Sequence, residues 1–382
     1  MSLPPIVVVG RFPPPLDGQA LATERLASLL ASERAVTRVD VGAPEGVHVV
    51  TTIQPSRLGH FLQHRASLAR ALVAQPGAAV LWPSVSPGLL GHARDRAAVV
   101  PAFGAARPVV AVVHRGDFPD LFERAATRWS GRRLVQRLET VVFLTEALAA
   151  ACAQWVPDAK RIVIPNTIDD AAIPDEAEVA KARAARAARL GTSRRPEVRL
   201  LYLSGLIPSK GYPDVLEALA VLRGRGVDAQ ATFAGRWTSD AAERAFRSRV
   251  AELGVAESVA LPGVVSRDAV RRLMLAHDLF VLPTAYPFEA QPLTVIEALA
   301  TATPVIVTRH AGLPEMVAGG REAEFVPYRA PERIADAAEA LVARWPSASQ
   351  QARARFDATF APAAVRTAWN ALLASLPQRR TG

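Results

Sequence analysis

Short apolar runs alternate with longer amphipathic stretches along most of this chain. In the first half, the strand-like runs cover residues 6–10, 109–114, 140–145 and 161–166, and a helix-like stretch over residues 20–30 follows the first of them. Because these runs are apolar along their whole length, they are typical of parallel strands that are buried on both faces. The first half therefore predicts an α/β domain built on a doubly wound parallel sheet.

A second series of the same kind begins near residue 199. Between the two series, the alanine- and arginine-rich residues 176–190 and the turn residues after them indicate a linker region. Two successive series favour two doubly wound, Rossmann-like α/β domains that face each other across a cleft. The last segment, residues 360–376, predicts an amphipathic helix that needs a partner surface. The second series predicts strands over residues 199–204, 230–235, 259–263, 280–284 and 304–308, and helices over residues 213–222 and 241–253.

Composition adds limits to this picture. The 382 residues suit two domains of ordinary size, and no apolar run is long enough to span a bilayer. The opening residues predict a first strand rather than a signal peptide. Cys152 is the single cysteine, so an intramolecular disulfide and a cysteine zinc cluster are excluded. We therefore expect a cytoplasmic protein.

The net charge of +9 and the pI of about 10.6 leave several partners open. Basic residues concentrate over residues 122–137 and 181–199. If residues 122–137 form one helix, Arg124, Arg128 and Arg132 share a face of it. That face is either solvated or a docking surface for an acidic membrane. The sequence has no helix-turn-helix, zinc-finger or RNA-binding signature, so nucleic acid is not expected as a partner.

Two glutamates eight residues apart carry the clearest chemical signal. Glu289 and Glu297 lie between two predicted strands near the end of the second series. Pro292 suits the first position of a short helix, and Pro304 ends that helix. Glu289 then lies in the loop before the helix, and Glu297 lies about one and a half turns inside it. Carboxylates beside a helix N-terminus suit a ligand that combines vicinal hydroxyls with phosphate, as a nucleotide sugar does.

Weaker signals lie at the ends of other predicted strands. Gly18, with Gln19 beside it, follows the first strand and allows backbone amides at a helix start to meet a phosphate or sugar oxygen. Lys210 precedes a helix N-terminus, where a cation needs an anion nearby. His114 ends a strand, at the edge where such sheets bind ligands. Asn166 lies in a predicted turn and is expected to bond nearby backbone.

Taken in order, these motifs resemble the retaining glycosyltransferases of family 4, which have the GT-B fold. The most specific part is FEAQPLTVIEALATATPVIVT, which begins at Phe288 and is followed by GLPE at residues 312–315. The resemblance spans nearly the whole chain. The looser matches are the Gly18 loop, His114, PNTID at residues 165–169, SKG at 209–211, FAG at 233–235 and PGV at 262–264.

The resemblance implies a domain organisation. Residues 1–172 would form an N-terminal acceptor domain, completed by a C-terminal helix near residues 360–382. Residues 173–359 would form the domain that binds the nucleotide sugar.

The resemblance also implies a role for each motif. Glu297 would hold the ribose hydroxyls, and Glu289 would lie against the donor sugar. Lys210 would neutralise charge on the departing diphosphate, and His114 would lie near the sugar and the acceptor. The catalytic residues would thus be Glu289, His114 and Lys210. The nucleotide sugar would be bound by Gly18, Gln19, Gly205, Lys210, Gly211, Gly235, Arg236, Gly263, Val264, Ala290, Gln291, Pro292, Leu293, Thr294 and Glu297.

The implied reaction transfers a sugar from a nucleoside-diphosphate sugar to an acceptor hydroxyl with retained anomeric configuration. No metal or other cofactor is expected, because cationic side chains and helix N-termini do that work in this family. The expected acceptor is a glycan or a lipid-linked precursor in cell-surface polysaccharide or glycolipid assembly, with peripheral contact to the anionic inner membrane face. Two alternatives stay open, namely a non-catalytic GT-B partner subunit and a nucleotide-sugar 2-epimerase.

Two positions depart from the family pattern. Gly205 stands where many members have an arginine beside Lys210, and Arg236 and Arg309 are the candidates to replace it. Ala290 stands where a glycine is common. The missing arginine favours the non-catalytic alternative, whereas the two retained glutamates favour an enzyme.

Overall fold

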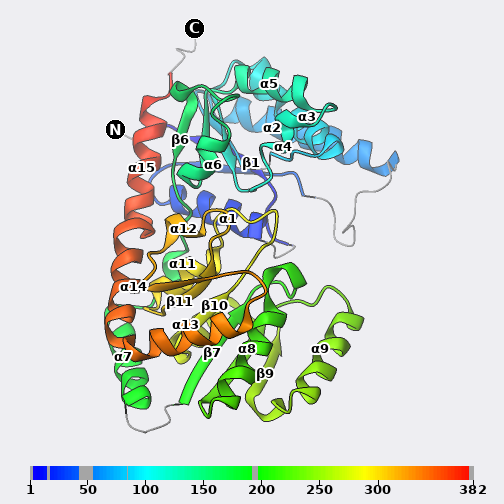
Figure 1. The fold of residues 1–382 in the computed structure, drawn as a ribbon. Coiled ribbons are helices and arrows are strands. Elements are labelled where there is room, and N and C mark those ends of the chain that lie inside the picture. Colours follow the sequence, from blue (N-terminus) through cyan, green and yellow to red (C-terminus); the bar gives the residue numbers. More distant parts are fainter. Residues whose placement is uncertain (1–2, 15–17, 43–54, 84, 192–196, 378–382) are drawn as a thin grey trace. The chain divides into compact units, whose positions relative to one another are not determined.

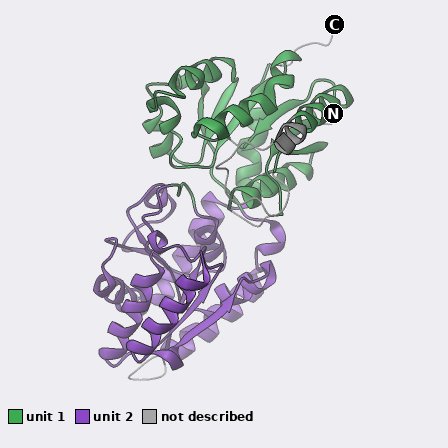
Figure 2. Ribbon diagram, turned by 90° about the vertical axis from the view of Figure 1, so that its right-hand side faces the viewer, with its two compact units in different colours: residues 1–167, 288–291, 362–382 green, residues 168–287, 292–361 purple. Residues whose placement is uncertain are grey.

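The computed structural model describes residues 3–14, 18–42, 55–83, 85–191 and 197–377 (Figure 1). The chain divides into two compact units (Figure 2). Unit 1 comprises Met1–Thr167, Phe288–Gln291 and Pro362–Gly382, and unit 2 comprises Ile168–Pro287 and Pro292–Ala361. Within the described ranges, each unit has a six-stranded sheet, and neighbouring strands are parallel. The predicted doubly wound α/β class is therefore confirmed.

Unit 1 has the strand order β2-β1-β3-β4-β5-β6. The sequence predicted β1, β4, β5 and β6, although the last three end slightly earlier than expected, and it did not single out β2 and β3. The strands are β1 (Ile6–Gly10), β2 (Val36–Asp40), β3 (Ala79–Trp82), β4 (Val109–Val113), β5 (Thr140–Phe143) and β6 (Arg161–Val163). The helices are α1 (Gly18–Ala31), α2 (Pro55–Ala74), α3 (Leu89–Gly104), α4 (Asp120–Glu123), α5 (Arg128–Arg137), α6 (Glu146–Ala151), the 3-10 helix η1 (Asp158–Lys160) and α15 (Pro362–Ser375).

Both faces of the unit 1 sheet are covered by helices. Because successive strand residues point to opposite faces, Val7 of β1 packs in a cluster with residues of α2 to α6, whereas Val8 packs with α1 and α15. Trp369 and Leu372 bring α15 into that second cluster. The amphipathic helix predicted at the end of the sequence therefore has its partner surface in unit 1.

Unit 2 has the strand order β12-β11-β10-β7-β8-β9. Its core combines the strands with the inner faces of their helices in one hydrophobic cluster. The strands are β7 (Glu197–Leu203), β8 (Asp228–Ala234), β9 (Val259–Gly263), β10 (Leu279–Leu282), β11 (Val305–Thr308) and β12 (Ala323–Val326). The helices are η2 (Asp170–Ala172), α7 (Glu176–Gly191), η3 (Pro208–Lys210), α8 (Tyr212–Gly224), α9 (Asp240–Glu252), η4 (Ala256–Ser258), α10 (Arg267–Ala276), α11 (Leu293–Ala300), α12 (Leu313–Met316), α13 (Pro331–Ala343) and α14 (Trp345–Thr359). None of the helices in the described ranges is long and apolar enough to cross a bilayer.

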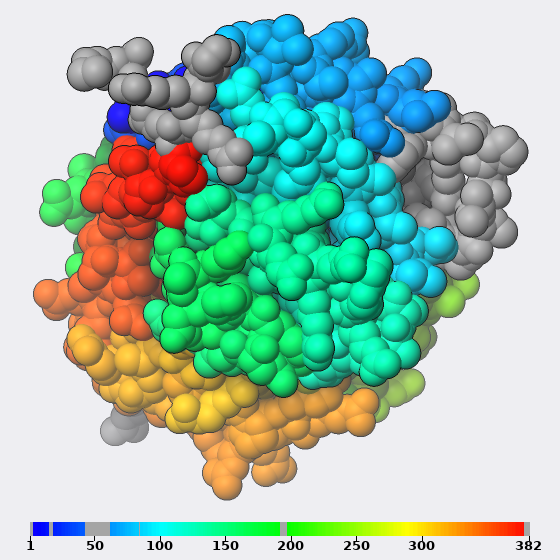
Figure 3. Space-filling model, turned by 90° about the horizontal axis from the view of Figure 1, so that it is seen from above, coloured from blue at the N-terminus to red at the C-terminus, as the bar shows by residue number. Residues whose placement is uncertain are grey.

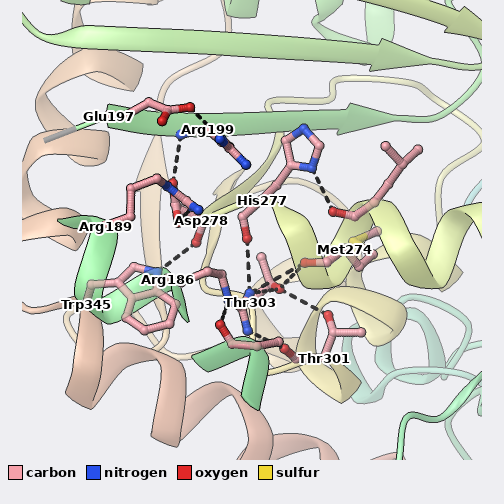
Figure 4. A network of polar contacts seen from close by, with 12 residues as sticks. Arg186, Arg189, Glu197, Arg199, Met274, His277, Asp278, Thr301, Thr303 and Trp345 are labelled. Carbon is pink, nitrogen blue, oxygen red and sulfur yellow. Dashed lines mark hydrogen bonds and ion pairs between the residues drawn. The ribbon is translucent and has the colours of Figure 1, made fainter. Parts of the chain in front are cut away.

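The linker predicted over residues 176–190 is instead α7, which packs on unit 2. Arg186 is only 1% exposed and donates hydrogen bonds to the carbonyl oxygens of His277 and Thr301, at 3.0 and 2.9 Å (Figure 4). Its guanidinium lies 5.0 Å from the ring centroid of Trp345. Burial lowers the pKa of Arg186 to about 10. The prediction of a linker was wrong because an alternation of alanine and arginine resembles a solvated segment. In the structure, tertiary partners bury Arg186.

A buried carboxylate completes the same network. Asp278 is fully buried, forms an ion pair with Arg189 of α7 and accepts a hydrogen bond from the amide of Arg199 at 2.8 Å (Figure 4). Arg183 donates to Ser349 Oγ at 3.1 Å. The arginines of α7 therefore tie this helix to the sheet and to α14, so the basic residues 183, 186 and 189 do not form the docking surface that the sequence left open.

The other basic segment is not one continuous helix. α4 ends at Glu123, and Arg124 has extended backbone with φ −68° and ψ 127°. Arg124 pairs with Asp120 at 2.5 Å. It therefore does not share a helical face with Arg128 and Arg132, which both lie on α5.

Candidate functional site

The strand order of unit 2 has a topological switch point between β7 and β10. From β7 the chain continues to β8 and β9 on one side, and from β10 it continues to β11 and β12 on the other. In open α/β sheets, ligands bind beyond the carboxyl ends of the strands at such a point. Lys210 follows β7 and Tyr286 follows β10, and Nζ of Lys210 lies 4.8 Å from the Tyr286 ring centroid. The predicted phosphate-neutralising lysine thus lies at the switch point.

Close backbone packing fixes the loop that carries Lys210. Gly211 has φ +84°, and a Cβ on it would lie 2.4 Å from the carbonyl oxygen of Pro283. The amide of Ala285 donates to the carbonyl of Ser209 at 2.8 Å. The SKG loop and the loop after β10 therefore pack directly on each other, and only glycine fits at position 211.

Glycines lie at the ends of the neighbouring strands. Gly235 has φ +149°, and a Cβ on it would lie 1.8 Å from the carbonyl oxygen of Ser204. The amide of Gly235 donates to the carbonyl of Gly263 at 2.8 Å. Gly205 follows Ser204, and Val264, which is 58% exposed, follows Gly263. The predicted donor-binding positions of β7, β8 and β9 are thus neighbours along one edge.

The helix that carries Glu297 starts one residue later than predicted. Pro292 is its N-cap, with φ −66° and ψ 122°, so α11 begins at Leu293. The helix already ends at Ala300, because Ala302 adopts φ +55° and turns the chain before Pro304. Most of α11 is buried in the core, whereas Leu293, Thr294 and Glu297 are partly exposed. These residues share a face because they are three or four positions apart.

Contacts from β11 hold the loop between β10 and α11. Thr308 Oγ1 donates to the carbonyl of Thr284. His310 Nε2 donates to the carbonyl of Tyr286 at 2.8 Å. The amide of Tyr286 donates to Thr284 Oγ1 at 3.0 Å. Tyr286 is therefore fixed beside Lys210 by its own backbone.

In unit 1, His114 follows β4 and borders a small cavity. The cavity measures about 20 Å³, which is room for about one water molecule, and Arg25, Asn166 and Trp369 also line it. Both ring nitrogens of His114 are buried and have no hydrogen-bond partner among the described residues. Burial lowers the pKa of His114 to about 4, so the imidazole is neutral at pH 7. Arg25, which the sequence did not single out, is 5% exposed.

Unit 1 has its own switch point, between β1 and β3. Gly18 is the first residue of α1, and Gln19 Nε2 donates to the carbonyl of Pro83 after β3 at 3.1 Å. Gln19 thus connects the two strand ends at this point. Residues 15–17 of the predicted loop lie outside the described residues.

The short segment Phe288–Gln291, which carries Glu289, belongs to unit 1, although the sequence placed it in the second domain. Glu289 is 8% exposed. Ala290 is 4% exposed and packs in the unit 1 core. The core therefore accommodates the Cβ of an alanine at the position where the family that the sequence resembles often has glycine. Glu289 and Glu297 are therefore divided between the two units, and the boundary follows Gln291.

The two candidate replacements for the family arginine have different positions in unit 2. Arg236 is exposed, and its carbonyl accepts a hydrogen bond at 2.8 Å from the amide of Leu206, which follows Gly205. Arg309 follows β11, and its guanidinium lies 4.2 Å from the ring centroid of Phe325. Arg236 is therefore the candidate that adjoins the glycine position.

The structure thus gathers the predicted residues in two groups. Unit 2 brings together Lys210, Gly211, Gly205, Gly235, Arg236, Gly263 and Val264 at three strand ends, and Pro292, Leu293, Thr294 and Glu297 at the start of α11. Unit 1 holds Gly18, Gln19, His114, Glu289, Ala290 and Gln291. Sequence reasoning missed Tyr286, which is visible only once the loops are packed. In the described part of the chain, no group of three potential metal-ligating side chains lies together.

Comparisons with known proteins point to one enzyme class. Residues 191–357 match the family described as Glycosyl transferases group 1. Mannosylfructose-phosphate synthase of Agrobacterium fabrum is 35% identical over 131 residues, which are 33% of this chain and 28% of that protein. Alpha-D-kanosaminyltransferase of Streptomyces kanamyceticus is 26% identical over 227 residues, which are 58% of this chain and 56% of that protein. The chain thus spans between 28% and 56% of the lengths of these two curated relatives.

Solved structures share the fold over nearly the whole chain. HepE of Anabaena in complex with UDP aligns with a TM-score of 0.75 and 18% identity, over 98% of this chain and 100% of that chain. Sucrose-phosphate synthase of Thermosynechococcus elongatus aligns with a TM-score of 0.71 and 17% identity, over 97% and 98% of the two chains. The predicted GT-B fold is thereby confirmed.

Proposed function

We propose that this protein is a retaining glycosyltransferase that moves a sugar from a nucleoside-diphosphate sugar to an acceptor hydroxyl. The observation that carries the proposal is the switch point of unit 2, where Lys210 lies beside the end of β10 and α11 carries Glu297. The match to Glycosyl transferases group 1 supports the reaction class. A nucleoside diphosphate as leaving group is supported by a solved structure of the same fold, whose title names UDP as its ligand.

Each group in unit 2 has a task in this reaction. The amides at the start of α11, at Leu293 and Thr294, bind the diphosphate oxygens because a helix N-terminus attracts anions. Glu297 accepts hydrogen bonds from the ribose hydroxyls. Lys210 neutralises the charge that develops on the diphosphate as the bond to the sugar breaks. Arg236 supplies the second positive charge in place of the family arginine at position 205.

The groups in unit 1 act on the sugar. His114 is neutral, so each of its ring nitrogens serves a different hydrogen bond, one as donor and one as acceptor. It therefore orients sugar or acceptor hydroxyls rather than balancing phosphate charge. Glu289 accepts hydrogen bonds from the donor sugar.

In the proposed step, the bond between the anomeric carbon and the diphosphate oxygen breaks, and the acceptor oxygen bonds to the same carbon from the same face. The acceptor's proton passes to the departing diphosphate. The side chains above carry the charge, so turnover is expected to persist in EDTA. Proton NMR of the product reports the anomeric configuration, and an inverted product or a covalent sugar on Glu289 contradicts this step.

A membrane-bound acceptor is supported by the surface of unit 1. Exposed apolar side chains lie on three of its helices, namely Leu62 and Val73 on α2, Leu89, Leu90 and Val100 on α3, and Trp129 on α5. α2 packs on α3, and His92 of α3 bonds Ser130 of α5 at 2.9 Å. Figure 3 looks onto this part of the surface, where α2 is blue, α3 cyan and α5 blue-green.

The charge on these helices is one-sided. α5 exposes Arg128, Arg132, Arg133 and Arg137 and has no acidic residue, and Arg133 lies 4.2 Å from the ring centroid of Trp129. α2 has no acidic residue either, and the one acid of α3, Asp95, is 1% exposed. Arginine with exposed tryptophan suits the interface of an anionic bilayer. We therefore include a lipid-linked acceptor, in polysaccharide or glycolipid assembly at the inner membrane face, in the proposal.

The first test is a thermal-shift panel with UDP, GDP, ADP and TDP, on the wild type and on Glu297→Ala. A nucleotide at about a hundred times its dissociation constant adds roughly 2.7 kcal/mol to the native state. We expect a shift with one nucleotide that is lost in Glu297→Ala. Glu257→Ala, which removes an exposed glutamate of η4, is the matched control and should keep the shift.

The same preparation separates the alternatives. A nucleotide shift together with transfer or slow hydrolysis of a nucleotide sugar supports the enzyme. Binding without any turnover supports the non-catalytic partner subunit, and formation of a 2-epimer supports the epimerase. The absence of a shift with all four nucleotides would falsify the proposed nucleotide site.

A further inference from the structure

The segment that carries Glu289 is held at both ends by unit 1. On its N-terminal side, the guanidinium of Arg115 lies 4.5 Å from the ring centroid of Phe288, and the amide of Gly116 approaches the Phe288 carbonyl at 3.5 Å. Arg115 is itself fixed by two hydrogen bonds to Asp117, at 2.8 and 2.7 Å. The residue before Glu289 is thus packed on the loop that begins with His114.

On the C-terminal side, both the nitrogen and the oxygen of the Gln291 side-chain amide form hydrogen bonds. Its Nε2 donates to the carbonyl of Leu144 after β5 at 3.1 Å, and its Oε1 accepts from the backbone amide of Asn166 after β6 at 2.6 Å. The side chain of Asn166 donates in return to the Gln291 carbonyl at 3.3 Å. Gln291 is 7% exposed, its bond to the Leu144 carbonyl is buried, and its two bonds to Asn166 are partly buried. We call Gln291, Asn166 and the Leu144 carbonyl the amide clasp.

The clasp is a stronger constraint than a surface contact. Asn166 and Leu144 lie 125 and 147 residues from Gln291 in the sequence, so local chain geometry does not bring them together. Since a buried amide with unmet hydrogen bonds is unfavourable, Gln291 keeps its partners only in this one position. Ala290, buried in the unit 1 core, adds a packing contact between Glu289 and the clasp.

We propose that Gln291 is a positioning residue, whose clasp with Asn166 and Leu144 fixes Glu289 in the unit that carries His114. The proposal rests on the proposed glycosyl transfer, in which Glu289 and His114 both act on the sugar. The nucleotide groups, Lys210 and Glu297, belong to unit 2, and we expect them to keep their positions when the clasp is lost. Loss of the clasp therefore separates catalysis from nucleotide binding.

The clasp is tested with three variants in the full-length chain. Gln291→Ala removes the two hydrogen bonds of the Gln291 side chain and keeps the backbone carbonyl that accepts from Asn166. Gln291→Glu keeps the acceptor for the Asn166 amide and loses the donor to Leu144. Asn166→Ala removes only the 3.3 Å bond. Gln351→Ala, a partly exposed glutamine of α14 in unit 2, is the matched control.

We expect a graded loss of turnover. Gln291→Ala lowers kcat about 10- to 100-fold, which is the usual effect of removing a group that orients an active side chain. Gln291→Glu and Asn166→Ala have smaller effects, and Gln351→Ala has none. The dissociation constant of the nucleotide chosen from UDP, GDP, ADP and TDP, measured by calorimetry, stays within about twofold in every variant. Equal losses in kcat and in nucleotide affinity would indicate general damage and overturn the proposal, as would wild-type turnover in Gln291→Ala.

Hydrogen exchange separates this proposal from the proposed function. The peptide that covers residues 288–291 should exchange faster in Gln291→Ala than in the wild type, whereas the peptide of α11 should be unchanged. This comparison needs no substrate. If the wild type neither binds nucleotide nor transfers sugar, the proposed function fails while the clasp is still judged by exchange. If exchange at residues 288–291 is the same in both proteins, the clasp does not hold Glu289.

Discussion

At the scale of single residues, the environment of Lys210 is relevant to the role proposed for this lysine. It lies next to Tyr286 at the switch point, on a loop whose following residue must be glycine because of the Pro283 carbonyl. A lysine near a helix N-terminus is unfavourable without an anion. The position of Lys210 at the switch point agrees with the phosphate-neutralising role proposed for it.

Lys210→Met should lower kcat by about 10²- to 10³-fold, since one removed charge-stabilising group costs about that much at a developing anion. Steady-state transfer with the nucleotide sugar measures it. Lys181→Met, which removes an exposed lysine of α7, should leave the rate unchanged. A kcat within threefold of the wild type in Lys210→Met excludes the assigned role.

Calorimetry of nucleotide binding separates Arg236 from Arg309 as replacements for the arginine that many family members have at the position of Gly205. Arg236→Ala should weaken nucleotide diphosphate binding, because its backbone adjoins the residue after Gly205. Arg309→Ala is the internal comparison, since its guanidinium is stacked on Phe325. The opposite ranking in calorimetry would assign the task to Arg309.

At the scale of elements, α7 shows how a polar network fixes a helix on a sheet. Arg186 reaches the chain that leaves α11 through the Thr301 carbonyl, and Arg189 pairs with the buried Asp278 (Figure 4). Burial raises the pKa of Asp278 and lowers the pKa of Arg186 to about 10. His277 belongs to the same region and is neutral, since Nδ1 donates to the Leu273 carbonyl and Nε2 accepts from Thr232 Oγ1.

The pKa of His277 predicts a pH dependence of stability. Burial lowers this pKa from 6.5 to about 4. Between pH 4 and 6.5, His277 is therefore protonated in the unfolded chain and neutral in the folded chain. The contribution is complete above pH 6.5, is lost as pH falls toward 4, and amounts to about 3 kcal/mol. Between pH 6.5 and 4, the free energy of unfolding of His277→Gln should fall less steeply with pH than that of the wild type. The difference in slope should correspond to about one proton. Equal slopes for both proteins in denaturant titrations would contradict the assignment.

At the scale of the whole molecule, the positive charge is distributed unevenly. In unit 2, surface arginines such as Arg249 and Arg225 pair with the acids Glu217 and Glu339, both at 2.6 Å. The exposed arginines of α5 have no ion pair with an acid in the described part of the chain. Surface arginines of unit 2 are thus paired with acids, whereas α5 in unit 1 carries a concentration of positive charge that contributes to the net charge of +9.

The membrane contact predicts binding to vesicles with anionic lipid. Arg132→Glu/Arg133→Glu on α5 should reduce flotation with vesicles that contain phosphatidylglycerol at least tenfold, since each basic residue near an anionic surface contributes about 1 kcal/mol. Arg244→Glu/Arg272→Glu reverses two exposed arginines of unit 2 and changes the net charge equally. If both double variants float alike, or if the wild type does not prefer anionic vesicles, α5 is not the docking surface.

Much of the fold could be predicted from the sequence because the signals are local. The fully apolar strands, such as Ile6–Gly10, and the proline before α11 are read from neighbouring residues alone. The break between α4 and α5 could not be predicted, because Arg124 has good helix propensity and its pairing with Asp120 depends on the turn. α7 was misread for a related reason, since only its tertiary partners bury Arg186.

The sequence by itself determined the doubly wound α/β class and the identity of the candidate residues, because periodicity and residue type are encoded along the chain, and its motifs resembled a family with the GT-B fold. Only the tertiary structure decided which of those residues belong together. Glu289 and Glu297 are neighbours in the sequence, yet Gln291 bonds to residues more than a hundred positions away and assigns Glu289 to unit 1. The physical reason is that buried hydrogen bonds and packing act through space, and no local pattern records their partners.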